Sequence, residues 1–463
     1  MSCHHIILVL FAVKTAVFVF GTTMIDLFEY SKYIDAFDFE MTSTLPSFDT
    51  YFEKVDFFVR NGAWKVDYSD IYVEKPEMQN LMNLIDKGSK VTHLDLDRGS
   101  MESETMETLF LGLQRSNVEY LSMNDMNLFP EDLAALAKNM QKYPVPTLKY
   151  VSLNELYLEP ENLKTLLVNG IGKAQVDLLD FHDNRFGNVG ASLLASHLGH
   201  FQVKGLDLSR NEIRPDGIKD FLAAVPGSRL EFLDISSNPI GWVGWETLLN
   251  ILPKSNLQEI RFGAVLNLDF ASKLWESIDQ TPKLRGLGLQ LYGENYEDTV
   301  LGLKILSRMI RATNLSRLEV KLSVDRSFSN EISSSDIIEA VADSTVNSFT
   351  LIGGYLGPDN MLKLKDAKNL RYLDSYFDIS EKSAVSAFAS LVASSPIERL
   401  VIHGKWKLDL DDVQEIVRSC SVSKSLKTVV FPWFLGDSSK LLFKALGHLP
   451  ALEILKYKYS NFK

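Results

Sequence analysis

One stretch of the chain, VKGLDLSRNEIRPDGIKDFLAAV from Val203 to Val225, is close to a copy of another. The second stretch, LEFLDISSNPIGWVGWETLLNIL from Leu230 to Leu252, begins 27 residues later and has the same landmarks in the same places. Both read apolar-x-x-apolar-x-apolar-x-x-Asn-x-apolar, then reach a glycine, and then continue in a helical pattern. Self-similarity at a fixed period indicates a repeat architecture.

The first apolar position of this pattern recurs along almost the whole chain. Its spacing is 27 to 30 residues from Val118 to Leu284 and becomes looser towards the C-terminus. About sixteen repeats therefore extend from near residue 34 to the end, which leaves no room for a second domain. The repeats are expected to start at Ile34, Ala63, Val91, Val118, Leu148, Val176, Val203, Leu230, Leu257, Leu284, Leu315, Val346, Leu370, Ile397, Leu426 and Leu452.

Each repeat predicts a short strand, a turn and a helix. Alternating apolar residues such as Leu206 and Leu208 indicate a strand with one buried face. Asn211 follows the strand, where its amide can satisfy backbone groups of the turn and stack with Asn184 and Asn238 of the neighbouring repeats. A glycine six residues later opens a helix with apolar residues at three- and four-residue spacing. Because one unit cannot bury its own apolar face, the units must stack into a solenoid.

The segment LDLSRNEIRPDGIKDFLAAV resembles the long, helix-bearing subtype of leucine-rich repeat found in ribonuclease inhibitor-like proteins. The resemblance is strongest over Val176–Leu252 and weakens where the asparagine position holds Met126, Leu156, Val265 or Tyr292. It implies an α/β leucine-rich repeat solenoid shaped as a horseshoe. Parallel strands would line the concave face, and helices the convex face.

In such a horseshoe, the residues between the apolar strand positions point into the concave opening. Two of these positions hold Asp95, Asp180, Asp207, Asp234 and His182. Parallel strands lie ~4.8 Å apart, so these side chains become near neighbours. The pattern predicts an acidic surface that docks a basic protein partner, with the pKa of His182 raised by the acids beside it. The alternative is that these aspartates are solvated residues common to such repeats.

The C-terminal repeats place aromatic residues at the corresponding positions. They are Tyr372, Tyr376, Phe377, His403, Trp433 and Tyr459. Exposed aromatic residues on neighbouring strands are typical of protein-binding hot spots. We therefore predict partner contacts at Tyr376, His403, Trp433 and Tyr459. The alternative is a shift of register by one residue, which would place several of them in the core.

Composition and the N-terminus limit the class of protein. The net charge of -12 disfavours nucleic acid as a partner. Cys3 and Cys420 are the only cysteines, which excludes a disulfide framework. Residues 1–21 resemble a secretory signal peptide, although Lys14 interrupts the apolar run, which is too short to span a membrane comfortably. We expect a signal or apolar segment at 1–21, a repeat domain with an N-terminal cap at 22–463, and a secreted rather than cytoplasmic monomer.

The sequence lacks the motifs of common catalytic sites. It contains no phosphate-binding loop, no His-Glu-x-x-His zinc helix and no Gly-x-Ser-x-Gly elbow. His197 and His200 have a metal-compatible spacing but no third ligand nearby, so we expect no catalytic, cofactor or metal residues. The predicted function is non-enzymatic protein binding through the concave face. The alternative is a small-GTPase regulator similar to the leucine-rich Ran GTPase-activating protein, although this chain ends in KYKYSNFK rather than an acidic tail.

Overall fold

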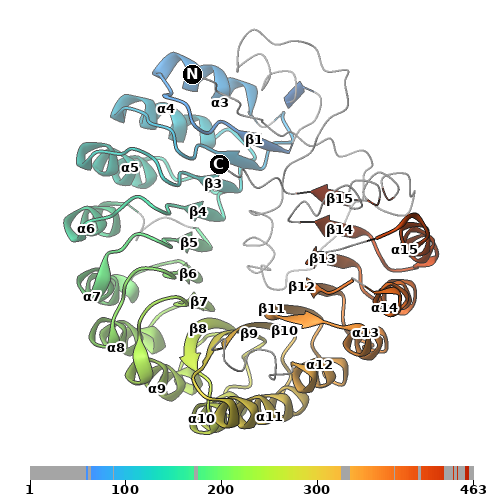
Figure 1. Ribbon diagram of the computed structural model, residues 1–463. Helices are drawn as coiled ribbons and strands as arrows, with labels where there is room; N and C mark the ends of the chain where they lie inside the picture. The colour runs from blue at the N-terminus through green and yellow to red at the C-terminus, as the bar shows by residue number, and fades with distance from the viewer. Residues whose placement is uncertain are drawn as a thin grey trace. The chain divides into compact units, whose positions relative to one another are not determined.

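The computed structural model describes residues 59–60, 64–86, 88–170, 176–324, 334–379, 381–404, 408–431, 442, 446 and 454–457 (Figure 1). These residues form two compact units that divide between Leu257 and Gln258. The segment 1–21 and the repeat expected at Ile34 lie outside the described residues. No helix in the described ranges has the length and apolar character needed to cross a membrane.

The first unit alternates short strands with helices of ten to thirteen residues. Its elements are β1 Lys65–Asp67, α3 Lys75–Leu84, β2 His93–Asp95, α4 Ser103–Leu113, β3 Tyr120–Ser122, α5 Pro130–Lys142, β4 Tyr150–Ser152, α6 Pro160–Asn169, β5 Leu178–Asp180, α7 Gly187–Leu198, β6 Gly205–Asp207, α8 Pro215–Ala224, β7 Phe232–Asp234 and α9 Gly241–Ile251. Single 3-10 turns, η2 Val225–Gly227 and η3 Leu252–Lys254, follow α8 and α9.

The second unit has the same alternation. Its elements are β8 Glu259–Val265, α10 Leu268–Asp279, β9 Gly286–Gly293, α11 Tyr296–Ala312, β10 Arg317–Val324, α12 Ser335–Ala342, β11 Ser348–Leu356, α13 Pro358–Lys365, β12 Tyr372–Phe377, α14 Lys382–Ser394, β13 Arg399–His403, α15 Leu410–Val422, β14 Thr428–Phe431 and β15 Ile454–Tyr457.

Within each unit the strands pair in chain order, and every pair is parallel. The first unit runs from β1 to β7 and the second from β8 to β15. The helices of each unit lie along the outer side of its strands (Figure 1). Because a helix is about 10 Å wide and strands lie about 4.8 Å apart, each stack curves with its strands inside. The expected α/β solenoid is confirmed; we call the strand side facing away from the helices the inner face.

The repeat starts predicted from the sequence coincide with the observed strands. Every strand begins two residues after the first apolar position of its repeat, as Gly205 does after Val203 and Arg399 after Ile397. The rule also holds for the degenerate C-terminal repeats. The apolar landmarks therefore set the register in both units.

The core lies between strands and helices. Leu206 in β6, Leu208 directly after β6 and Phe221 in α8 are fully buried there. Gly217 packs tightly against the preceding repeat, because a Cβ added to it would be 2.6 Å from the Cα of Asn188. Close packing against the preceding repeat thus requires glycine at position 217.

The asparagine position forms a buried ladder of side-chain amides, as predicted. The amide of Asn211 donates to the carbonyl of Phe181 (2.8 Å), and its oxygen accepts from the backbone N–H of Asn184 (3.0 Å). The oxygen of Asn238 accepts in turn from the backbone N–H groups of Asn211 (2.9 Å) and Ile213 (3.0 Å). These amides satisfy backbone groups of the turns in neighbouring repeats.

Strand length changes at the start of the second unit. The strands of the first unit have three residues each, whereas β8, β9, β10 and β11 have seven, eight, eight and nine. Val265 and Tyr292 occupy the asparagine position in β8 and β9. Met126 and Leu156 occupy the same position after β3 and β4, which have only three residues each, so loss of the asparagine does not by itself determine strand length.

Candidate binding site

The third residues of the strands form a column of short polar side chains along the inner face of the first unit. The aligned residues are Asp67, Asp95, Ser122, Ser152, Asp180, Asp207 and Asp234. The expected alignment of the four aspartates is thus confirmed. Asp95, Asp180 and Asp234 are nevertheless buried, with 9%, 5% and 4% of their surface exposed, and Asp207 is half-buried. Docking of a basic partner on this column stays a prediction.

Asp95 belongs to an internal network at the N-terminal end of the column. Its carboxylate forms an ion pair with Lys65, but burial outweighs this charge and raises the pKa of Asp95 to about 6. His93 stacks on Tyr120, and Tyr120 stacks on Tyr150, with ring centroids 5.2 and 4.5 Å apart. Burial, aided by Lys65, lowers the pKa of His93 to about 4. These groups are engaged with one another rather than offered to solvent.

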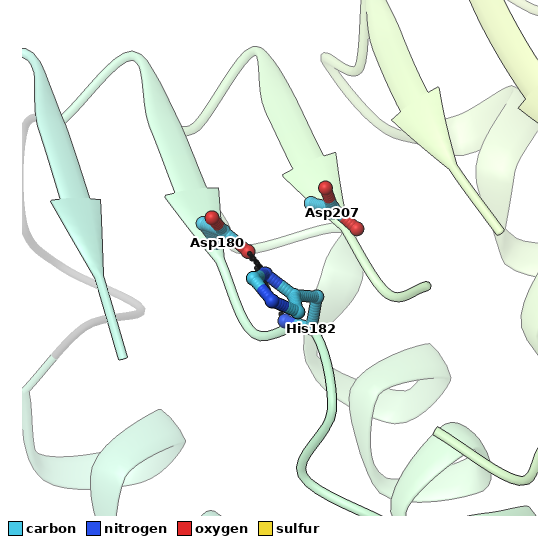
Figure 2. A group of neighbouring side chains, drawn as sticks. All are labelled: Asp180, His182 and Asp207. Carbon is cyan, nitrogen blue, oxygen red and sulfur yellow. Dashed lines mark hydrogen bonds and ion pairs between the residues drawn. The ribbon is translucent and has the colours of Figure 1, made fainter. Parts of the chain in front are cut away.

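Asp180 and His182 form the most elaborate polar cluster of this face, together with Asp207 (Figure 2). Nδ1 of His182 lies 3.1 Å from Oδ1 of Asp180. The other carboxylate oxygen accepts from the hydroxyl of Tyr150 (2.6 Å) and the amide of Asn154 (3.1 Å). Strand β5 thus ends in a carboxylate whose position is fixed from both sides.

Asp207 lies on the next strand and is held by its own turn. Its Oδ1 accepts from the backbone N–H (2.8 Å) and the hydroxyl (2.7 Å) of Ser209. Burial, with the charges of Asp234 and Asp180, holds the pKa of Asp207 well above its usual range. Burial alone would lower the pKa of His182, but its hydrogen bond to Asp180 and the nearby negative charges raise it to about 9, the direction expected from the sequence.

The same cluster has the composition of a cation site. Asp180, His182 and Asp207 each offer one ligand atom, and within the described ranges these atoms lie within 4.8 Å of one another. Local spacing in the sequence does not reveal this group. Asp180 and Asp207 are 27 residues apart and become neighbours only because β5 pairs with β6.

In the second unit, the structure brings together Tyr376 and His403 from neighbouring strands. Their rings stack with centroids 4.8 Å apart and an interplanar angle of 27°. Nε2 of His403 lies 2.9 Å from Oδ1 of Asp374, and the hydroxyl of Tyr372 donates to the other oxygen of Asp374 (3.1 Å). The carboxylate of Asp374 therefore fixes the orientation of the histidine ring.

Tyr355 joins this pair and was not expected from the sequence. It is 66% exposed, and its ring meets Tyr376 edge to face at 6.0 Å. The register of β11 shifts between Leu351 and Tyr355. Gly353 lies in this bulge with a φ of 88°, and a Cβ on it would be 1.9 Å from the carbonyl oxygen of Leu322. The bulge is what places Tyr355 beside Tyr376; we call Tyr355, Tyr376 and His403 the aromatic cluster.

The remaining aromatic expectations have different outcomes. Phe377 is fully buried, so its expected place on the inner face was wrong; it alternates with Tyr376 along β12 and therefore points to the core. Trp433 and Tyr459 lie outside the described residues. The signal that could have revealed Tyr355 is the Gly353-Gly354 pair before it, since glycine inside a strand pattern suggests a bulge.

The comparisons with known proteins find likenesses among solved structures. No protein-family model and no curated protein matches the chain. Among solved structures, it is similar to the leucine-rich repeat-containing protein LegL7 from Legionella pneumophila, with 16% identity and a TM-score of 0.37. The match covers 53% of this chain and 79% of LegL7. The repeat landmarks, the parallel strands and the outer helices make each unit an α/β solenoid of the leucine-rich repeat type.

Proposed function

We propose that this protein is a non-enzymatic interaction module that binds a protein partner through the inner faces of its solenoid. Repeat solenoids present extended surfaces of this kind to their partners. The observation that carries the proposal is the aromatic cluster, where an exposed Tyr355 stands beside the ordered pair Tyr376 and His403. The subtype proposed is the ribonuclease inhibitor-like one, because helices of ten or more residues recur at intervals of 27 in the cleanest repeats.

The aromatic cluster has the physical properties of a binding hot spot. Tyrosine supplies a large contact area at a low cost in side-chain entropy, and its hydroxyl still finds polar partners. Tyr376 and His403 are already oriented by stacking and by Asp374, so their ordering costs little on binding. Truncation of such a residue typically weakens binding by about 2 kcal/mol or more.

The chemistry of the proposed partner follows from charge. The chain carries a net charge of -12, which favours encounter with a basic protein. A guanidinium group that stacks on the exposed ring of Tyr355 would add a cation–π contribution of about 0.5–1 kcal/mol. We therefore propose a partner segment that contains arginine.

Site-directed photo-crosslinking tests the proposal. A benzophenone amino acid replaces Tyr355 in the full chain, and the matched control carries it at Tyr296, an exposed tyrosine of the outer helix α11. Exposure to an extract from the source tissue should crosslink one protein at position 355 and not at position 296. Tyr376→Ala in the same chain should reduce this yield at least tenfold.

Equal crosslinking at both positions, or a yield that Tyr376→Ala leaves unchanged, would refute binding at the aromatic cluster. Recovery of a small GTPase would favour the alternative of a GTPase regulator.

We also propose that the protein is a secreted monomer. The apolar segment at 1–21 resembles a signal peptide, which supports secretion. N-terminal sequencing of the native protein checks this, and a chain that starts at Met1 would contradict it.

A further inference from the structure

We propose that Asp180, His182 and Asp207 bind a divalent transition-metal ion, with Zn²⁺ as the best fit, on the inner face of the first unit (Figure 2). The three residues come from two neighbouring strands and the turn after the first of them. The site does not depend on the aromatic cluster of the second unit. It adds a ligand of a different chemical class to the proposed protein-binding function.

The separation of the first two ligand atoms suits one shared ion. Nδ1 of His182 and Oδ1 of Asp180 lie 3.1 Å apart. Two bonds of about 2.05 Å to one zinc ion would then enclose an angle of about 98°, between octahedral and tetrahedral values. Binding replaces the proton that lies between these atoms in the metal-free protein.

Asp207 completes the site with a small movement. Its ligand atom lies within 4.8 Å of the other two, whereas tetrahedral zinc ligands lie about 3.3 Å apart, so its carboxylate must turn inward by at most about 1.5 Å. Ser209 holds only Oδ1, and the second oxygen of Asp207 accepts no hydrogen bond from any residue in the described ranges. That oxygen is therefore free to turn towards a cation.

The surroundings have the features of a supporting shell. Tyr150 and Asn154 donate to the oxygen of Asp180 that does not face His182, which orients the ligand as outer partners do in metal sites. The side chain of His182 is 34% exposed, so an ion can enter from solvent. Imidazole together with carboxylates suits Zn²⁺, whereas Mg²⁺ and Ca²⁺ prefer oxygen ligands alone.

The charge balance also favours a cation. Asp180, Asp207 and Asp234 lie side by side on three strands. Two basic side chains near Asp180 and Asp207 form ion pairs with other carboxylates. Lys204 pairs with Asp177 at 3.2 Å, and Arg210 with Asp183 at 3.2 Å. A divalent ion would neutralise Asp180 and Asp207 more completely than His182 can alone.

Zinc titration of the full chain tests the site. Binding of Zn²⁺ is measured by calorimetry and by competition with a fluorescent chelator, with Mg²⁺ as the comparison ion. His182→Gln and Asp207→Asn should each remove one equivalent of zinc or weaken its binding at least ~10-fold. Asp183→Asn, which changes a neighbouring acid outside the cluster, and the double variant His197→Gln/His200→Gln should keep that equivalent.

Two further measurements make the result decisive. Circular dichroism shows whether each variant is folded, and Zn²⁺ should raise the melting temperature of the wild type but not of His182→Gln. If His182→Gln fails to fold, the site is tested instead with the isosteric variant Asp207→Asn and with the absorption spectrum of the Co²⁺-loaded wild type. Unchanged stoichiometry and affinity in Asp207→Asn, loss in Asp183→Asn to the same degree, or a Co²⁺ spectrum of the hexa-aqua ion would overturn the proposal.

Discussion

The asparagine ladder makes a quantitative prediction about stability. Replacing Asn211 by alanine removes the acceptor for the backbone N–H of Asn184, which then has no partner in a buried turn. It also removes one of two donors to the carbonyl of Phe181, whose other donor, the amide of Asn184, remains at 3.0 Å. An unsatisfied buried N–H costs about 1–3 kcal/mol, and a lost hydrogen bond about 1 kcal/mol more. Asn211→Ala should therefore lower the unfolding free energy by about 2–4 kcal/mol.

Asn238→Ala should be more damaging than Asn211→Ala. The oxygen of Asn238 accepts from two backbone N–H groups, those of Asn211 and Ile213, so its loss leaves two buried donors unpaired. The additional cost is again about 1–3 kcal/mol. The matched control is Asn250→Ala on the exposed side of α9, which should stay within about 0.5 kcal/mol of the wild type.

Urea unfolding, followed by far-ultraviolet circular dichroism and by tryptophan fluorescence, measures these differences. The two signals must report the same transition, because a solenoid can lose its repeats in stages. An Asn211→Ala variant as stable as Asn250→Ala would refute the role assigned to the ladder. An Asn238→Ala variant milder than Asn211→Ala would refute the count of unsatisfied donors.

Three further outcomes are expected. Gly353→Ala should lower the unfolding free energy by more than about 1–3 kcal/mol, because its φ is 88° and its Cβ would meet a carbonyl oxygen; Gly227→Ala, where nothing lies within 4 Å, is the control, and equal urea midpoints would contradict the strain. The lowered pKa of His93, about 4, means that the unfolded chain binds its proton more tightly. Stability should thus fall by up to about 3 kcal/mol as the pH drops from 6.5 to 4, and His93→Gln should lose that part of the slope in pH-dependent urea unfolding. Burial raises the pKa of Cys420 to about 12, so iodoacetamide at pH 8 should alkylate its peptide in urea but not in the native protein, as judged by mass spectrometry.

The repeat architecture could be predicted because it depends on apolar periodicity. The landmarks around Leu206 and Leu208 exclude water from one face of a strand, and any sequence that keeps them keeps the stacking. Even Ile397, in a repeat that lacks most polar landmarks, starts a unit at the expected offset. The ladder of Asn184, Asn211 and Asn238 could be predicted as well, because an amide both donates and accepts.

The position of a residue within a repeat does not determine how far its side chain is buried on the inner face. Asp95, Asp180 and Asp234 were expected to point into the opening, and they do occupy the inner column. Their short side chains nevertheless lie among longer neighbours such as Lys65 and Tyr150, which cover and bind the carboxylates. Which partner reaches which carboxylate depends on side chains 28 to 30 residues away in sequence.

This burial changes where specificity should reside. The aspartates of the column are hydrogen-bonded by other residues of this chain. Tyr150 and His182 contact the carboxylate of Asp180, and Ser209 donates to that of Asp207. Those groups can hold a small ion but present little charge to a large partner. Tyr355 reaches solvent because the bulge at Gly353 breaks the register of its strand. We therefore propose that the departures from the repeat, rather than its consensus positions, supply the surface that a protein partner recognises.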